Sequence, residues 1–138
     1  MSSIKTLSLY VACDGESASG KSFSSNIIAK KYKLFCINSG LLFRYASQLI
    51  LKHKPKKIIP FLKKKFQNLN YKKITQLNLH TQEISNHVVI LSQKKGVRAI
   101  TKAFQKKIIR KHSRILCEGR DAASAILRKK PRYDVAFY

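Results

Sequence analysis

The sequence predicts an α/β fold with a central parallel sheet flanked by helices. Short apolar runs alternate with amphipathic stretches along the chain, and a glycine-flanked loop joins the first apolar run to a helical segment. Parallel strands need crossover connections, usually helices, so this alternation favours βα units. With 138 residues, of which 44% are apolar, the chain is long enough for one globular domain.

Each element has its own signal. Apolar runs of strand length predict strands over residues 7–13, 33–37, 115–117 and 133–138, and a shorter run suggests another over residues 74–79. Apolar spacing of three and four residues predicts helices over residues 21–32, 39–53, 81–91, 97–112 and 122–127. Ser39 and Thr81 are candidate N-caps. Residues 118–121 are expected to form a turn after the third strand.

A basic segment interrupts this alternation. Residues 52–73 contain nine lysines and no acidic residue, with two prolines. An apolar helical stripe is expected within the segment, formed by Ile58, Phe61, Leu62 and Phe66. We therefore expect a single domain over residues 1–138, with a small basic insert at about residues 52–80.

The sequence ends inside its last predicted strand, at Tyr138, with no covering helix after it. A parallel strand in that position would leave apolar surface and an open edge. We expect this sequence to be part of a longer protein.

The net charge of +23 comes from 29 basic and 6 acidic residues. An anionic partner such as nucleic acid is one interpretation, and a lysine-rich composition spread over solvated faces is the other. The lysines are scattered and no aromatic-interleaved RNA motif accompanies them, which favours the second. We therefore expect no specific nucleic-acid partner.

The lack of recognisable targeting signals and the pattern of cysteines predict a cytoplasmic location. No apolar run approaches the roughly 18 residues of a membrane helix, and no signal peptide is recognised at the N-terminus. Cys13, Cys36 and Cys117 are widely spaced and lie in apolar stretches, which is typical of reduced core thiols. We expect a cytoplasmic protein with no membrane association, and a monomer.

The strongest motif fits G-x-x-x-x-G-K-[ST] in full, after an apolar strand and before a helix. In such a loop the backbone N–H groups converge on phosphate oxygens, and the helix N-terminus adds partial positive charge. Lys21 is expected to reach the β- and γ-phosphates of ATP, and Ser22 to ligate Mg²⁺. The residues of this predicted ATP site are Gly15, Glu16, Ser17, Ala18, Ser19, Gly20, Lys21 and Ser22.

The loop predicts that a nucleoside triphosphate binds but does not show where its phosphate goes, and two arginines are candidates for a second anion site. Arg44 lies in the helix after Ser39 and Gly40, and Arg120 follows the third strand, at the edge where open α/β sheets bind ligands. Guanidinium groups suit a phosphate dianion, although either arginine alone is also compatible with an ordinary surface position.

These motifs together resemble bacterial cytidylate kinase. The matching residues are Asp14-Gly15 with Ser17-Ala18-Ser19-Gly20-Lys21, then Ser39-Gly40-Leu41-Leu42-Phe43-Arg44, then Val97-Arg98 with Gln105, then Glu118-Gly119-Arg120-Asp121. Their order and rough spacing agree with the family pattern over almost the whole chain, apart from the insert.

The resemblance implies a role for each matched residue. Lys21, Arg44 and Arg120 would be catalytic, the two arginines by holding the phosphate of CMP. Ser39 and Gly40 would line the acceptor site, and Arg98 and Asp121 would hydrogen-bond the cytosine edge, with Ser85 as a further cytosine contact. Asp121 also suits a helix cap before Ala122, and both roles are compatible.

The sequence departs from the family pattern at several points. Asn38 stands where the family usually has Asp, Phe43 where it has Tyr and Glu118 where it has Asp. The insert is shorter and more basic than the family's CMP-binding domain, and the family's arginine-rich lid is missing. The resemblance thus implies a P-loop kinase fold without its C-terminal strands and lid.

We therefore expect an ATP- and Mg²⁺-dependent kinase of CMP or dCMP. The alternatives are a P-loop kinase with another small acceptor, an inactive fragment and a basic nucleic-acid-binding protein. Competition among acceptors separates the kinases, and a steep salt dependence would mark polyanion binding.

Overall fold

The computed structural model describes residues 9–14, 21–119 and 134–137. The chain divides into two compact units. A sheet unit combines Met1–Asn38 with Gln105–Tyr138, and a helical unit comprises Ser39–Phe104. The helical unit is thus one continuous segment inserted in the sequence between the two halves of the sheet unit.

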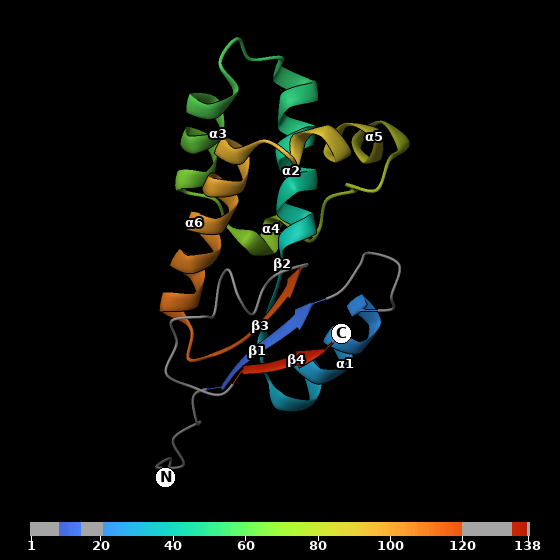
Figure 1. Ribbon diagram of the computed structural model, residues 1–138, viewed down its shortest axis with the longest axis vertical. Coiled ribbons are helices and arrows are strands. Elements are labelled where there is room, and N and C mark those ends of the chain that lie inside the picture. The colour runs from blue at the N-terminus through green and yellow to red at the C-terminus, as the bar shows by residue number, and fades with distance from the viewer. Residues whose placement is uncertain (1–8, 15–20, 120–133, 138) are drawn as a thin grey trace. The chain divides into compact units, whose positions relative to one another are not determined.

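Within the described residues, the sheet unit contains four parallel strands. They are β1 (Leu9–Asp14), β2 (Phe35–Asn38), β3 (Arg114–Gly119) and β4 (Asp134–Phe137), in the spatial order β2-β3-β1-β4. Helix α1 (Lys21–Tyr32) lies against the sheet (Figure 1). The predicted parallel α/β fold is confirmed, because every strand pair runs parallel and the chain joins β1 to β2 through a helix.

The core between α1 and the sheet is small and apolar. Its buried members are Val11, Cys13, Ala29, Leu34 and Leu116. Consecutive residues of β1 and β3 are buried, so both faces of these strands are covered, which explains why they are continuous apolar runs in the sequence. The sequence of α1 is not strongly amphipathic, so packing against this core is what stabilises the helix.

The helical unit is built from α2 (Ser39–His53), α3 (Ile58–Gln67), α4 (Tyr71–Ile74), α5 (Gln82–Leu91) and the first part of α6 (Lys95–Lys111). Phe66 of α3 joins the unit together, since its ring lies 5.9 Å from Tyr45 of α2 and 5.7 Å from Phe104 of α6. Leu62 and Phe66 are buried, and Ile58 and Phe61 are half-buried, so the apolar stripe predicted within the insert is confirmed. Helix α5 packs against α2.

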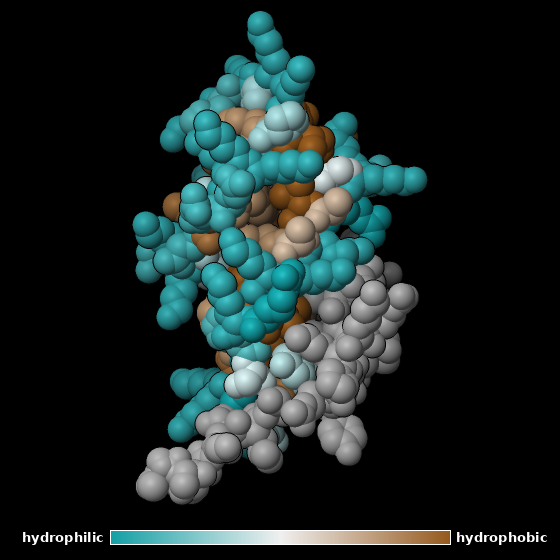
Figure 2. Space-filling view, turned by 90° about the vertical axis from the view of Figure 1, so that its left-hand side faces the viewer, coloured by the Kyte–Doolittle hydropathy of each residue, from teal (hydrophilic) through white to brown (hydrophobic). Residues whose placement is uncertain are grey.

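The surface of the helical unit is dominated by its lysines. All nine lysines of residues 52–73 are exposed. Figure 2 shows hydrophilic side chains projecting around an apolar interior that is visible between them. The charge therefore lies on solvated faces, while the apolar stripe of the same segment forms the core.

The local predictions fared unevenly. The N-cap at Thr81 is confirmed, since its hydroxyl accepts a hydrogen bond from the backbone N–H of Ile84. The N-cap predicted at Ser39 is wrong by one position. Strand β2 ends at Asn38 and α2 begins directly at Ser39, so Ser39 is the first helical residue. The short strand over residues 74–79 is wrong: α4 ends at Ile74 and a hydrogen-bonded turn follows.

The turn predicted over residues 118–121 is wrong at its first two residues. Glu118 and Gly119 extend β3 by pairing with β2 and β1, and the other two residues lie outside the described part of the chain. The predicted final strand agrees with β4, whereas the helix expected over residues 122–127 also lies outside the described residues.

The sequence predicts no membrane-spanning helix and favours reduced cysteines over disulfides. Among the described residues, no helix is both long enough and apolar enough to cross a membrane. The three cysteines are all described, form no disulfide and are buried or half-buried, as predicted for core thiols.

Candidate active site

The predicted motifs meet at the carboxyl edge of the sheet. In the β1–β3 register Asp14 lies opposite Gly119, and in the β2–β3 register Asn38 lies opposite Glu118. The phosphate-loop motif continues from Asp14 and the Gly-Arg-Asp sequence continues from Gly119. Motifs more than 100 residues apart in the sequence therefore leave the sheet at neighbouring points.

This edge is also the topological switch point of the sheet. From β1 the chain crosses over β3 to reach β2, whereas after β3 it appears on the other side of β1 as β4. Open α/β sheets bind their ligands in the crevice at such a point. The fold thus supports the sequence-based choice of this edge.

Helix α1 begins at Lys21, inside the phosphate-loop motif. The N-terminus of a helix presents free backbone N–H groups and the positive end of the helix dipole, which suits a polyphosphate. Lys21 and Ser22 are its first two residues. Gly15, Glu16, Ser17, Ala18, Ser19 and Gly20 lie outside the described residues.

A buried carboxylate marks the same edge. Glu118 is 3% exposed, and its charge acts on the neighbouring thiol of Cys36. Burial raises the pKa of Cys36 to about 11, with further contributions from Glu118 and Cys13. Cys36 is therefore a protonated thiol at neutral pH.

In the helical unit, Arg44 and Ser85 are brought together. The Nη1 group of Arg44 donates hydrogen bonds to the backbone carbonyl of Leu79 at 3.0 Å and to the Ser85 hydroxyl at 3.1 Å. Arg44 comes from α2 and Ser85 from the first turn of α5, and both side chains are half-buried. Two residues predicted to act on the same substrate are thus in direct contact.

The remaining predicted acceptor residues are distributed along the same unit. Ser39 and Gly40 open α2, and Arg98 is exposed in the first turns of α6. Arg120 and Asp121 lie outside the described residues, so the structure does not bear on their roles.

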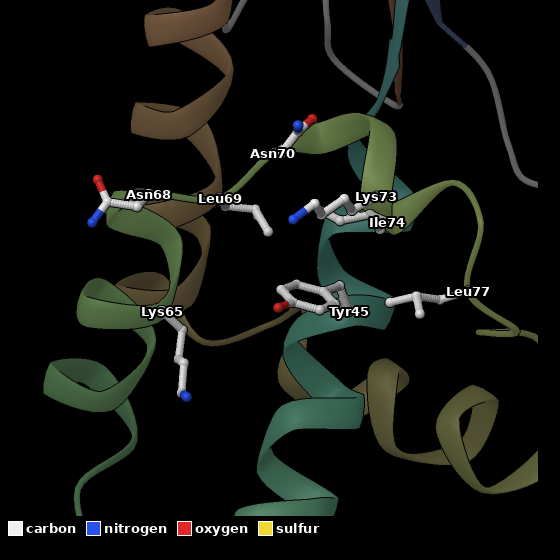
Figure 3. Close-up of a pocket in the computed structure, with 8 residues that line it drawn as sticks. All are labelled: Tyr45, Lys65, Asn68, Leu69, Asn70, Lys73, Ile74 and Leu77. Carbon is white, nitrogen blue, oxygen red and sulfur yellow. The ribbon is translucent and has the colours of Figure 1, made fainter.

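A separate hollow of about 240 Å³ lies between α3, α4 and α2. In Figure 3 the Tyr45 hydroxyl and the Lys73 side chain extend toward it from α2 and α4, whereas Asn68 and Asn70 point away. Burial raises the pKa of Tyr45, so this hydroxyl is protonated at neutral pH. None of the predicted site residues lines this hollow.

Comparison with known proteins identifies the family of this chain. The family model described as cytidylate kinase matches residues 11–132, which is most of the chain and includes every motif above. The chain belongs to the cytidylate kinase family. This confirms the resemblance drawn from the motifs.

Individual cytidylate kinases agree with this assignment. The enzyme of Clostridioides difficile (strain 630) is 30% identical over 141 residues, which cover 94% of this chain and 63% of that relative. Those of Lactococcus lactis subsp. lactis (strain IL1403) and Aquifex aeolicus (strain VF5) are 29% and 28% identical, covering 88% and 89% of this chain. The chain spans between 60% and 63% of the length of these relatives.

Two features of the site were missed by sequence reasoning. The Leu79 carbonyl holds Arg44, but a backbone acceptor carries no side-chain signature that a sequence could show. Glu118 stands out in the sequence as a departure from the family's usual aspartate, but its burial and its effect on the Cys36 thiol follow only from its place in β3.

Proposed function

We propose that this chain serves in a cytidylate kinase, which transfers the γ-phosphate of ATP to CMP or dCMP and releases ADP with CDP or dCDP. The family match over residues 11–132 carries this proposal, because it spans both the donor and the acceptor motifs. We assign residues 1–138 to one P-loop domain with a basic insert, acting in the cytoplasm as a monomer.

On the donor side, Gly15 to Gly20 wrap the phosphates of ATP while Lys21 neutralises charge on the β- and γ-phosphates. The Ser22 hydroxyl is a hard oxygen donor of the kind Mg²⁺ prefers, and its place at the start of α1 fits that role. Ser22 would hold the ion, which would offset negative charge on the phosphates of ATP.

On the acceptor side, Arg44 and Arg120 bind the phosphate of CMP, and Ser39 with Gly40 line the site. Arg98 and Asp121 read the cytosine edge, which presents an amino donor beside the N3 and O2 acceptors. No covalent enzyme intermediate is needed, because positioning and charge neutralisation supply the catalysis.

The first test is ADP release from MgATP with CMP, dCMP, UMP, AMP or shikimate as acceptor. CMP or dCMP should be preferred, and Lys21→Ala should reduce the rate by at least about a hundredfold because it removes a cation from the transferring phosphoryl group. Lys30→Ala, at the other end of α1, is the matched control and should keep the wild-type rate.

An ATP-induced rise in the melting temperature gives a second readout that does not require turnover. The wild-type chain should show this rise and Lys21→Ala should largely lose it. Equal stabilisation of both chains by ATP would contradict the role of the loop, and a preference for another acceptor would contradict the cytidylate assignment.

A further inference from the structure

The guanidinium group of Arg44 is held at one nitrogen. Its Nη1 carries two N–H donors, and the structure gives it two acceptors, the Leu79 carbonyl at 3.0 Å and the Ser85 hydroxyl at 3.1 Å. Both Nη1 protons are therefore used within the protein.

The remaining donors of Arg44 lie along another edge of the same plane. Nε–H and one Nη2–H point in parallel, and such a pair matches two oxygens of a phosphate or carboxylate. Fixing Nη1 fixes the guanidinium plane and so the direction in which this Nε–Nη2 edge faces.

The two acceptors are themselves held firmly. Leu79 is fully buried in the connection between α4 and α5, and Ser85 lies in the first turn of α5, where its backbone N–H donates to the Thr81 carbonyl at 2.9 Å. The Thr81 side chain caps that turn by accepting from Ile84, and α5 packs against α2. Arg44 is thus tied to a capped helix end rather than to a loose loop.

We propose that Ser85 is a positioning residue for Arg44: together with the Leu79 carbonyl it anchors Nη1 and leaves the Nε–Nη2 edge to bind a nucleoside monophosphate side-on. This rests on the proposed function, in which Arg44 binds the phosphate of CMP. It changes the role of Ser85, whose hydroxyl acts on the phosphate through Arg44 instead of contacting cytosine.

Comparing CMP with cytidine separates these two roles. A residue that positions Arg44 affects only the phosphate, whereas a cytosine contact affects both ligands equally. Ser85→Ala should weaken CMP binding about tenfold, the value of roughly one charge-assisted hydrogen bond, and leave cytidine binding unchanged. Isothermal titration calorimetry on the full chain measures both affinities.

Two variants control this experiment. Ser85→Thr keeps a hydroxyl and should restore most of the CMP affinity. Ser92→Ala also removes a serine hydroxyl at α5, one that bonds to the nearby Val89 carbonyl, and it should bind both ligands as the wild type does. Equal loss of CMP and cytidine affinity in Ser85→Ala, or no loss, would overturn the proposal.

A measurement without nucleotide keeps this inference separate from the proposed function. In ¹⁵N-arginine NMR spectra the two Nη1 protons of Arg44, identified by their loss in Arg44→Lys, should give separate signals that merge in Ser85→Ala. Merged signals already in the wild type would refute the anchor. Separate signals with no CMP binding by the wild type would establish the anchor and contradict its use for CMP.

Discussion

Cys36 occupies an unusual electrostatic position for a residue with no assigned chemistry. Its thiol is half-buried in β2, and Glu118 and Cys13 add negative potential to the effect of burial. The outcome is a thiol whose pKa of about 11 lies above its ordinary value of 9.0. The protein therefore keeps this cysteine protonated beside the carboxyl edge of the sheet.

The raised pKa predicts an alkaline loss of stability. The folded state holds the Cys36 proton more tightly than the unfolded state, so the stabilising contribution is complete below pH 9.0 and is lost as the pH rises toward about 11. Chemical denaturation across this window should show a steeper fall in the free energy of unfolding for the wild type than for Cys36→Ser. Identical slopes for the two chains would contradict the prediction.

For single residues, the sequence predicted which residue types belong to the site, but not which of them are in contact. Arg44 was recognised from its motif, while its two acceptors lie 35 and 41 residues further along the chain. A contact of that range depends on how α2, α4 and α5 pack, and no local pattern encodes it. Ser85 was selected for another reason, and its contact with Arg44 emerged only from the fold.

Two helices end on a lysine in the left-handed region of backbone conformation. Lys33 after α1 has φ 55°, and Lys54 after α2 has φ 46°. The N–H of Leu34 returns to the Ala29 carbonyl at 2.8 Å, and that of Lys54 to the Ile50 carbonyl at 2.8 Å. These are the Schellman and αL endings, in which glycine is the usual residue because a side chain disfavours positive φ.

Replacing Lys54 by glycine should therefore stabilise the protein. Relief of the left-handed strain outweighs the added flexibility of the unfolded chain, and we expect a gain of about 0.5–1 kcal/mol. Thermal denaturation of Lys54→Gly measures it. Lys52→Gly is the matched control: it lies within α2, where glycine should cost about 1 kcal/mol, so destabilisation by both variants would refute this interpretation.

Helices with a strong amphipathic period were predicted to within a few residues, as α2 and α5 illustrate. The error at residues 74–79 has a physical cause, because the apolar residues there serve tertiary burial instead of strand pairing. Ile74 closes α4 and Leu79 is fully buried beyond a turn, so both apolar side chains fill the core without forming a strand.

Charge is unevenly distributed over the whole molecule. The helical unit contains 14 lysines and arginines and a single acidic residue, Glu83. Like charges at this density repel one another and oppose the compact state, although they keep the protein away from self-association. Burial of the unit's apolar side chains opposes that repulsion.

Screening should therefore stabilise the protein. Raising NaCl from about 0.05 to about 0.5 M shortens the range of charge repulsion severalfold and should raise the melting temperature. The double variant Lys63→Gln with Lys64→Gln, which removes two exposed charges from α3, should melt higher at low salt and gain less from added salt. A wild-type melting temperature that stays flat or falls with salt would show that charge repulsion does not limit stability.

The alternation of strands and helices predicted the parallel sheet, but the division into two units was beyond the sequence. The boundary between the units coincides with no loop: it falls where β2 passes into α2 and inside α6. The sequence becomes lysine-rich only from Lys52, well inside the helical unit. Composition therefore indicates the lysine-rich segment but not the boundaries of the larger unit that contains it.

The order of strands in the sheet has a consequence for synthesis on the ribosome. The first two strands to emerge, β1 and β2, are not neighbours; both pair with β3, whose Arg114 lies opposite Leu9. Nascent β1 and β2 therefore have no β3 to pair with until Ser39–Phe104, the continuous segment between β2 and β3, has emerged. The helical unit can complete its own core before the sheet forms its first ladder, which leaves the two waiting apolar strands as natural targets for a chaperone.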